Sequence, residues 1–283
     1  MNLGMLTSEL SRPTASELFR AVAGYGFTEV QLDLASVAAE QMPERLDRDL
    51  VRRIRSEADA HGVAIVAING TFNMSHPDRA VREEGIRRLT PIAGACEALG
   101  CRFVTLCTGS RSRESMWRWD DGNLDPSAWA DMLDTMASAV EIAERYDLLL
   151  GIEPEASNVV NTAARARRLL DEMGSPRLKI IMDVANLFQP GEARPENVRS
   201  TMDRAFALLG EDIHIAHGKD IRAGEGLAFT HAGEGIVDYG YFLECLEALG
   251  YRGGMILHGI KNERYMPSCV SYMRGVMASR QRV

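Results

Sequence analysis

The segments LLLGIE (148–153), LKIIMD (178–183), DIHIAH (212–217) and GMILH (254–258) decide the fold of this chain. Each is a short, mostly apolar run that ends in an ionisable residue, and these end residues are Glu153, Asp183, His217 and His258. From 153 to 183, 183 to 217 and 217 to 258 the spacings are 30, 34 and 41 residues. Such spacings leave room for a helix between successive runs, so the pattern predicts four neighbouring strands of a parallel sheet.

The first half of the chain shows the same alternation. Its strand-like runs are Asn2–Leu6, Thr28–Leu32, Val63–Ile68 and Arg102–Leu106. Segments with helical spacing include Leu46–Ala60, Arg82–Leu99, Trp129–Arg145, Ala163–Met173 and Tyr241–Leu249. Eight strand–helix units in 283 residues, about 35 residues each, predict a single (β/α)₈ TIM barrel domain over residues 1–283. A doubly wound open sheet is the alternative, but Leu6-Thr7-Ser8-Glu9 lacks the G-x-G-x-x-G turn of many such sheets.

Composition and charge restrict the class of protein. The formal net charge of -8 disfavours a nucleic-acid partner. No apolar run approaches the roughly 18 residues that span a bilayer, so we expect no membrane segment. The first residues lack the basic and apolar regions of a signal peptide. Five cysteines without a C-x-x-C pair indicate reduced thiols, and we expect a cytoplasmic protein.

The four strand ends also predict a metal site. In a TIM barrel the C-terminal ends of the strands meet at one rim, which carries the active site. Two carboxylates and two imidazoles at this rim suit a divalent metal such as Mn²⁺, Zn²⁺, Co²⁺ or Mg²⁺. Taken singly, Glu153 could form a structural ion pair, Asp183 could cap a turn, and His217 could be a buried histidine with ordinary hydrogen bonds. Their joint placement favours the metal.

Several motifs carry a resemblance to a known family. They are GIEPE (151–155), DVAN (183–186), HGKD (217–220) and GEGIVDY (233–239). Together they resemble the sugar phosphate isomerase/epimerase family of xylose isomerase-like TIM barrels, in order and over nearly the whole chain. The resemblance implies a metal held by Glu153, Asp183 and His217, with a fourth ligand at the end of the eighth strand. It also implies a small sugar or sugar-phosphate substrate and a homo-oligomer.

The fourth ligand position departs from the family pattern, which usually has Glu where this chain has His258. A neutral nitrogen donor there shifts the preference from Mg²⁺ toward Mn²⁺ or Zn²⁺. It also leaves Glu153 as the one clear family base, which favours isomerisation over epimerisation. His258 would restore a second base if it does not bind the metal. Glu155 and Glu263 are further candidates, although Glu263 fits better at the start of the last helix.

The remaining candidate residues concern the substrate. Lys219 is expected to stabilise charge on a substrate oxygen, or else to pair with Asp220. The GEG turn at 233–235 is expected either to offer N–H groups to a phosphate or to form only a tight turn. The long segment from Cys107 to Asp125 could be a lid, although its tryptophans could instead pack against another subunit. The proposed substrate contacts are Asn73, His76, Trp117, Arg118, Glu155 and Asn186.

Together with the family resemblance, these residues predict a metal-dependent isomerase that acts on a small sugar, sugar acid or sugar phosphate through an enediolate. Glu153, Lys219 and His258 are the predicted catalytic residues. A dehydratase or lyase on the same metal site and a non-catalytic sugar-binding barrel are the alternatives. An apurinic endonuclease is disfavoured because the chain is acidic and has Asn186 where that reaction would require another histidine.

Overall fold

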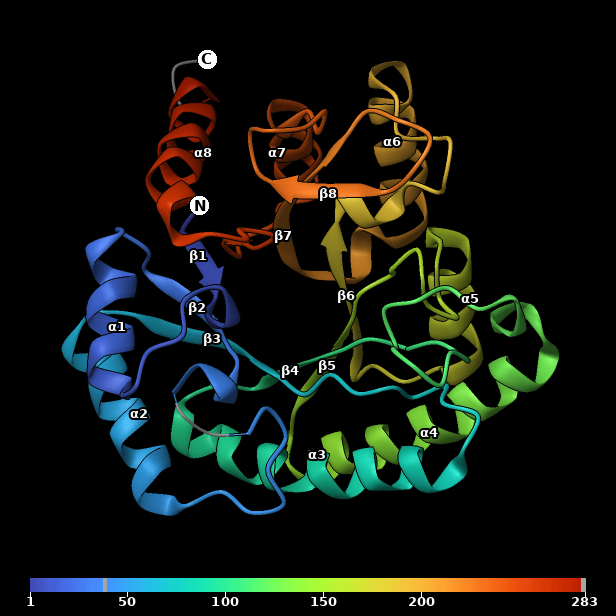
Figure 1. Cartoon of the computed structure of the whole chain (residues 1–283), viewed down its shortest axis with the longest axis horizontal. Coiled ribbons are helices and arrows are strands. Elements are labelled where there is room, and N and C mark those ends of the chain that lie inside the picture. Colours follow the sequence, from blue (N-terminus) through green and yellow to red (C-terminus); the bar gives the residue numbers. More distant parts are fainter. Residues whose placement is uncertain (38–39, 281–283) are drawn as a thin grey trace.

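The chain forms a closed barrel of parallel strands surrounded by helices, as a computed structural model shows for residues 1–37 and 40–280 (Figure 1). The strands are β1 (Leu3–Leu6), β2 (Glu29–Leu32), β3 (Ala64–Asn69), β4 (Phe103–Leu106), β5 (Leu149–Ile152), β6 (Leu178–Asp183), β7 (Ile213–Arg222), β8 (Ala228–His231) and β9 (Met255–Leu257). The helices are α1 (Ala15–Gly24), α2 (Arg48–Ala60), α3 (Arg79–Leu99), α4 (Pro126–Arg145), α5 (Ala163–Met173), α6 (Val198–Leu209), α7 (Tyr239–Ala248) and α8 (Met266–Arg280).

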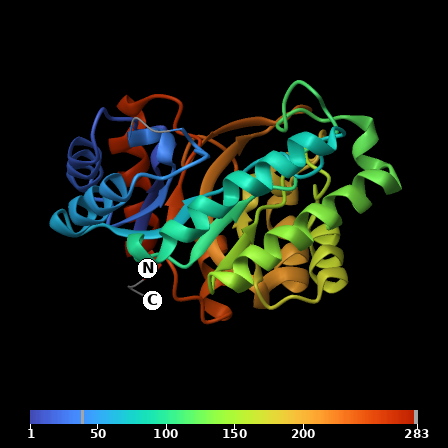
Figure 2. The same cartoon turned by 90° about the horizontal axis from the view of Figure 1, so that it is seen from below.

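The barrel closes through the pairing of β6 with β7. Strands β1 to β6 pair in sequence order, β1 also pairs with β9, and β9 pairs with β7, all in parallel. The parallel pair β6–β7 then completes a ring of eight strands. The helices lie outside this ring, and Figure 2 shows α3 (teal) and α4 (green) side by side on its surface. The predicted (β/α)₈ TIM barrel is confirmed.

Local capping explains where several helices begin. The Thr14 side chain accepts a hydrogen bond from the backbone N–H of Glu17, which forms the N-terminal part of the expected capping box of α1. Asp78 caps α3 in the same way, so this helix begins at Arg79, before the expected Arg82. Helix α5 has the predicted bounds. Short 3₁₀ helices occupy Thr7–Glu9, Leu34–Val37, Asp121–Leu124, Val184–Leu187, Pro195–Asn197, Gly210–Asp212 and Glu263–Tyr265.

The seventh strand is longer than the sequence indicates. Strand β7 continues past the expected end at Ala216 to Arg222 and pairs in antiparallel fashion with β8. The glycine-rich segment from 224 to 235 therefore contains a hairpin strand, where only a tight turn or a phosphate-binding turn was expected. The extension lies beyond the parallel ring and lacks a continuous apolar run, because its two faces meet different environments.

The helices and the cysteines bear on two further expectations, that the chain has no membrane segment and that its thiols are reduced. None of the helices in the described ranges is both long and apolar enough to cross a membrane. The five cysteines are free; Cys245 is half-buried, whereas Cys96, Cys101, Cys107 and Cys269 are buried.

Close packing under the candidate site depends on one glycine. Gly151 lies on β5 two residues before Glu153, so both positions face the same side of the strand. A Cβ at Gly151 would lie 2.3 Å from Cζ of Phe103 and 2.9 Å from Cγ1 of Ile181, on the two neighbouring strands. The aromatic ring of Phe103 therefore fills the space that a side chain on Gly151 would need.

We expect Gly151→Ala to lower the free energy of unfolding by about 1–3 kcal/mol, since Phe103 must move to accept the methyl group. Urea unfolding measures this change. The control is Gly275→Ala in α8, where the added Cβ would meet no atom within 4 Å. Because alanine has the higher helix propensity, the control is expected to raise stability by up to about 1 kcal/mol. Equal stability of Gly151→Ala and the wild type would show that Phe103 does not fill this space.

Candidate metal centre and its cavity

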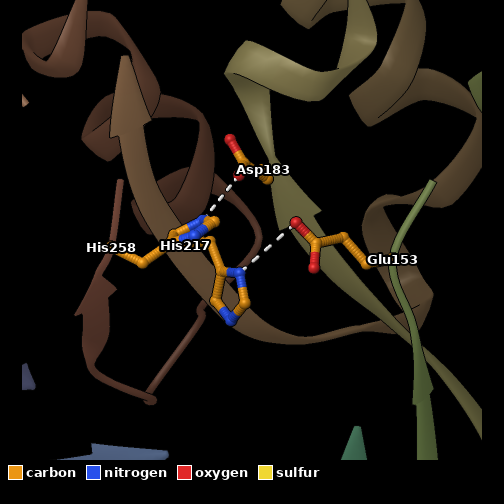
Figure 3. A group of neighbouring side chains, drawn as sticks. All are labelled: Glu153, Asp183, His217 and His258. Carbon is orange, nitrogen blue, oxygen red and sulfur yellow. Dashed lines mark hydrogen bonds and ion pairs between the residues drawn. The ribbon is translucent and has the colours of Figure 1, made fainter. Parts of the chain in front are cut away.

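The four residues predicted from the strand ends form one cluster. Glu153, Asp183, His217 and His258 each offer a ligand atom, and these atoms all lie within 4.8 Å of one another. Figure 3 shows the four side chains converging from separate segments of the barrel wall. The side chains of Asp183 and His217 are buried, and those of Glu153 and His258 are each 12% exposed. The cluster is thus sheltered but open on one side.

Strand register places these residues together. Asp183 on β6 is the direct partner of His217 on β7, so their side chains leave the same face of the barrel wall. Glu153 follows the last residue of β5, and His258 follows the last residue of β9. Strands β5 and β9 are neighbours of β6 and β7, respectively. The four donors are therefore fixed by backbone hydrogen bonds rather than by flexible loops.

His217 is oriented by a residue that sequence reasoning missed. Its Nε2 lies 2.8 Å from Oε1 of Gln31, a buried residue on β2. The amide group of Gln31 is held in turn, because its Nε2 donates to Oγ1 of Thr105 at 3.2 Å. An oxygen acceptor at Nε2 places the ring proton there and leaves a lone pair on Nδ1. Nδ1 of His217 is buried, faces Oε1 of Glu153 at 3.5 Å, and has no hydrogen-bond partner within the described residues.

Asp183 contacts the side chains of Lys219 and His258, of which the first is a cation and the second becomes one when protonated. Nε2 of His258 donates to Oδ2 of Asp183 at 2.8 Å, and Nζ of Lys219 lies 3.4 Å from the same oxygen. Burial opposes ionisation of Asp183, but Lys219 and His258 outweigh it and hold the pKa of this carboxyl group below its usual range. The carboxylate is therefore a charged ligand rather than a neutral acid.

Lys219 also connects the cluster to Glu153. Its Nζ donates to Oδ1 of Asn186 at 2.5 Å, and Nδ2 of Asn186 donates to Oε1 of Glu153 at 2.7 Å. Burial alone would lower the pKa of Lys219, but Asp183 and Glu153 outweigh it and raise this pKa. The lysine is thus an ammonium ion among carboxylates, and the alternative pairing with Asp220 is wrong.

The cluster opens into a cavity of about 340 Å³. Its polar lining includes Gln31, Thr71, Asn69 and Thr105, whereas its apolar walls include Leu6, Leu106 and Phe229. Nζ of Lys219 lies 4.3 Å from the centre of the Phe229 ring. Apolar walls with a few convergent polar groups are typical of small-molecule sites.

Three of the six expected substrate contacts line this cavity. Asn186 and Glu155 are buried at its wall, while Trp117 is 56% exposed at its edge. Glu155 accepts a hydrogen bond from Ser157. Burial nevertheless raises the pKa of Glu155, so this carboxyl group holds its proton more tightly than usual.

The other three expected contacts lie outside the cavity lining. The side chain of Asn73 joins two loops, because its Nδ2 donates to the carbonyl of Ser110 and its Oδ1 accepts from the Ser110 N–H. His76 accepts a hydrogen bond from the Asp78 N–H near the start of α3. The exposed guanidinium group of Arg118 pairs with Glu114. In the structure, these three side chains contact neighbouring segments of the chain and do not line the cavity.

Glu263, an additional candidate base, also lies away from the cluster. Its carboxylate pairs with Arg12 at 2.5 Å and accepts a hydrogen bond from the Tyr25 hydroxyl at 2.8 Å. It begins the 3₁₀ helix that leads directly into α8, whereas the last helix, which it was expected to begin, starts at Met266. Glu9, by contrast, was missed: its Oε1 accepts from the N–H of Gly259, directly after His258, at 2.9 Å. Its position just after the first strand was the available signal.

The GEG turn does not present its N–H groups to the cavity. The N–H groups of Gly233 and Gly235 donate to Oδ2 of Asp220 at 3.0 and 3.1 Å. The expectation that this turn binds a phosphate is therefore wrong for these two groups, because a carboxylate of the chain already occupies them.

Comparison with known proteins agrees with this architecture. The chain is 24% identical over 258 residues to "Putative L-ribulose-5-phosphate 3-epimerase SgbU" of Escherichia coli (strain K12), which covers 89% of this chain and 85% of the relative. A solved D-tagatose 3-epimerase-like protein superposes with a TM-score of 0.76 at 17% identity, covering 98% of this chain and 97% of the other.

A further similar structure comes from Bacillus anthracis and is described as the probable 3-DHS dehydratase AsbF of petrobactin synthesis. It has a TM-score of 0.75 at 14% identity and covers 98% of this chain and 99% of its own. At such identities the two solved structures support the fold alone. A family model described as xylose isomerase-like TIM barrel matches residues 19–274. Since this match spans most of the 283 residues, the chain belongs to the xylose isomerase-like TIM barrel family.

Proposed function

We propose that this protein is a metal-dependent isomerase or epimerase of a small sugar, acting through an enediolate. The observation that carries the proposal is the cluster of two carboxylates and two imidazoles at the wall of a cavity of about 340 Å³. Clustered carboxylates and imidazoles of this kind are typical of a divalent metal site in this family, and His258 stands here in place of the usual Glu. The relative named for a 3-epimerase supports the same reaction class.

The donor set fits a divalent cation. The unpartnered Nδ1 of His217 supplies a lone pair that faces the Glu153 carboxylate. Two carboxylates balance the two charges of the ion, and two imidazoles favour Mn²⁺, Zn²⁺ or Co²⁺ over Mg²⁺. Glu153, Asp183, His217 and His258 would hold the ion. When bound, it would polarise a substrate carbonyl and make the adjacent C–H more acidic.

The side chains of this protein would then move the proton and stabilise the charge. Glu153 at the cavity wall would accept the proton from the carbon beside the carbonyl. The buried ammonium group of Lys219 would donate a hydrogen bond to the oxygen on which charge develops. Return of the proton by Glu153 to the neighbouring carbon on the same face, with transfer of the hydroxyl proton from one oxygen to the adjacent one, would complete an isomerisation.

Epimerisation requires a second acid on the opposite face of the enediolate. His258 is engaged with Asp183 in the cluster, so it is better placed as a ligand than as a free base. Glu155 lines the cavity and its burial favours the protonated form, which makes it the better candidate for the second acid. Glu155 was a further candidate base in the sequence, and its position supports that role.

Dehydration is the second candidate function. It begins with the same proton abstraction but expels a β-hydroxyl group, which needs an acid to protonate the leaving oxygen. The raised pKa of Glu155 at the cavity wall favours such a step. The two reactions separate by their products, because dehydration yields water and an unsaturated or keto product whereas isomerisation conserves the formula of the sugar.

Metal analysis tests the cluster. We expect the purified protein to bind about one divalent cation per chain and Asp183→Asn to lose most of it, because the charged oxygen ligand is removed. The control is Glu263→Gln, a carboxylate outside the cluster that should keep full metal content. Elemental analysis and calorimetry measure both, with circular dichroism to verify folding. Folded Asp183→Asn that retains the wild-type affinity would contradict the site.

Gln31 offers a second test, because it fixes the His217 ring rather than binding the cation. We expect Gln31→Leu to weaken metal affinity about 10–100-fold, as loss of a hydrogen-bond partner to a ligating histidine does elsewhere. Gln31→Glu keeps an oxygen acceptor and should retain most of the affinity. In ¹⁵N NMR spectra, Gln31→Leu should populate the Nδ1-protonated tautomer of His217. Unchanged affinity and tautomer in Gln31→Leu would show that Gln31 does not position this ligand.

Proton exchange tests the reaction. With a panel of ketoses and aldoses in deuterium oxide, the metal-loaded protein should place deuterium on the reacting carbon. We expect Glu153→Gln to lower this exchange by at least about 100-fold, since the proton acceptor is lost. NMR or mass spectrometry follows the label. Turnover of a sugar without any incorporation of deuterium would contradict proton abstraction. Turnover with loss of water would show that the reaction is a dehydration.

A further inference from the structure

In the loops that often hold phosphate in TIM barrels, several backbone N–H groups donate here to side chains of the protein itself. In such barrels, phosphate groups frequently bind to backbone N–H groups in the loops after the seventh and eighth strands. In this chain, those loops follow β7 with its β8 hairpin, and β9. A phosphate bound there would need free N–H donors in these loops.

Asp220 occupies the first of these loops. Its Oδ1 accepts from the N–H groups of Ile221 and Val237 at 2.9 and 3.0 Å. Its Oδ2 accepts from Gly233 and Gly235 at 3.0 and 3.1 Å. The Asp220 side chain is buried, with 1% of the residue exposed. One internal carboxylate thus satisfies four N–H donors of the kind that would otherwise bind an anion.

The glycines of the turn are shaped around this carboxylate. A Cβ at Gly235 would lie 2.2 Å from Oδ1 of Asp220, so only glycine permits the approach. Gly233 has a φ of +92°, a backbone conformation that glycine adopts readily. The turn is therefore built to enclose Asp220, and its N–H groups donate to this carboxylate.

The next donors are occupied as well. Oε1 of Glu9 accepts from the N–H of Gly259 in the loop after β9. Asp238 caps the start of α7 by accepting from the Tyr241 N–H at 3.0 Å. Asn262 accepts from the Arg264 N–H at 3.0 Å in the turn before α8. At each of these three positions an acidic or amide side chain of the protein thus accepts from one N–H group.

The charges of the cavity are also unfavourable for a phosphate. Across the described part of the chain, Lys219 is the one lysine or arginine that lines the cavity, and its Nζ already contacts Asp183 and Asn186. Glu153 and Glu155 line the same cavity. Recognition of a phosphate dianion typically uses arginine forks, free ammonium groups or a set of free N–H groups.

We infer that the substrate is an unphosphorylated, uncharged polyhydroxy aldehyde or ketone, and that the occupied N–H groups and the shortage of cavity cations exclude its phosphorylated form. The inference rests on the proposed function and narrows it. The cavity lining fits such a ligand, because Asn69, Thr71 and Thr105 offer hydrogen bonds to hydroxyl groups. Its apolar walls suit the C–H faces of a sugar.

The test compares matched pairs: a pentulose with its 5-phosphate and a hexulose with its 6-phosphate, each with the metal-loaded wild-type protein. Deuterium exchange should favour the free sugar by about 100-fold or more in kcat/KM. A preference for the phosphorylated member would overturn the inference and leave the proposed isomerase intact. If neither member exchanges, the proposed function fails. Calorimetry with a pentitol and its phosphate then still decides the inference, since tighter binding of the phosphate would contradict it.

A variant tests whether the shortage of lysine and arginine side chains at the cavity disfavours the phosphorylated sugar. Trp117 lies at the exposed edge of the cavity, so its replacement is tolerable for folding. Trp117→Arg should raise kcat/KM for the phosphorylated member relative to the free sugar by about tenfold or more, and the neutral control Trp117→Met should not. An unchanged ratio in Trp117→Arg, with folding verified by circular dichroism, would contradict the contribution of cavity charge.

Discussion

The site depends on keeping two carboxylates, one buried and one largely shielded from water, close together at the rim of a closed barrel. Burial and mutual repulsion both oppose ionisation of Glu153 and Asp183, and removing either charge from water is costly unless it is paired. The register of β6 with β7 brings His217 opposite Asp183, and Lys219 follows two residues later on the same face. The backbone thus supplies the compensating groups in fixed positions, and a divalent cation would complete the neutralisation.

Lys219 joins the metal side of the site to the substrate side. Its ammonium group contacts Asp183 in the cluster and Asn186, which in turn holds the Glu153 carboxylate. Because these contacts form one chain, the orientation of the expected proton acceptor depends on the same lysine that would stabilise charge on the substrate. Such preorganisation reduces the rearrangement needed when the charge develops. It also explains why Lys219 is buried against Phe229 rather than extended into solvent.

The sequence predicted the barrel and its four-residue cluster because both follow from local patterns. Apolar runs report strands, and in a parallel barrel the residue that ends each run must lie at one rim. Gln31 could not be found in this way, since its role depends on β2 facing β7 across the barrel interior. The same limit applies to Arg118. Its position in a loop predicted a contact with the substrate, but its ion pair with Glu114 depends on how that loop folds. The β8 hairpin was missed because its strands lack a continuous apolar face.

The histidine at position 258 has a consequence for charge balance that agrees with an uncharged substrate. With a divalent cation bound, the carboxylates of Glu153 and Asp183 would balance its charge, and Lys219 would add a single positive charge. A glutamate ligand in place of His258 would cancel that excess. An uncharged sugar acquires one negative charge as its C–H proton passes to Glu153, which loses its own charge at the same time, so the positive charge of the site would act mainly in the transition state and thereby lower the barrier. A phosphate dianion would instead interact with this positive charge before the reaction begins. It would strengthen binding of the ground state without favouring the chemical step.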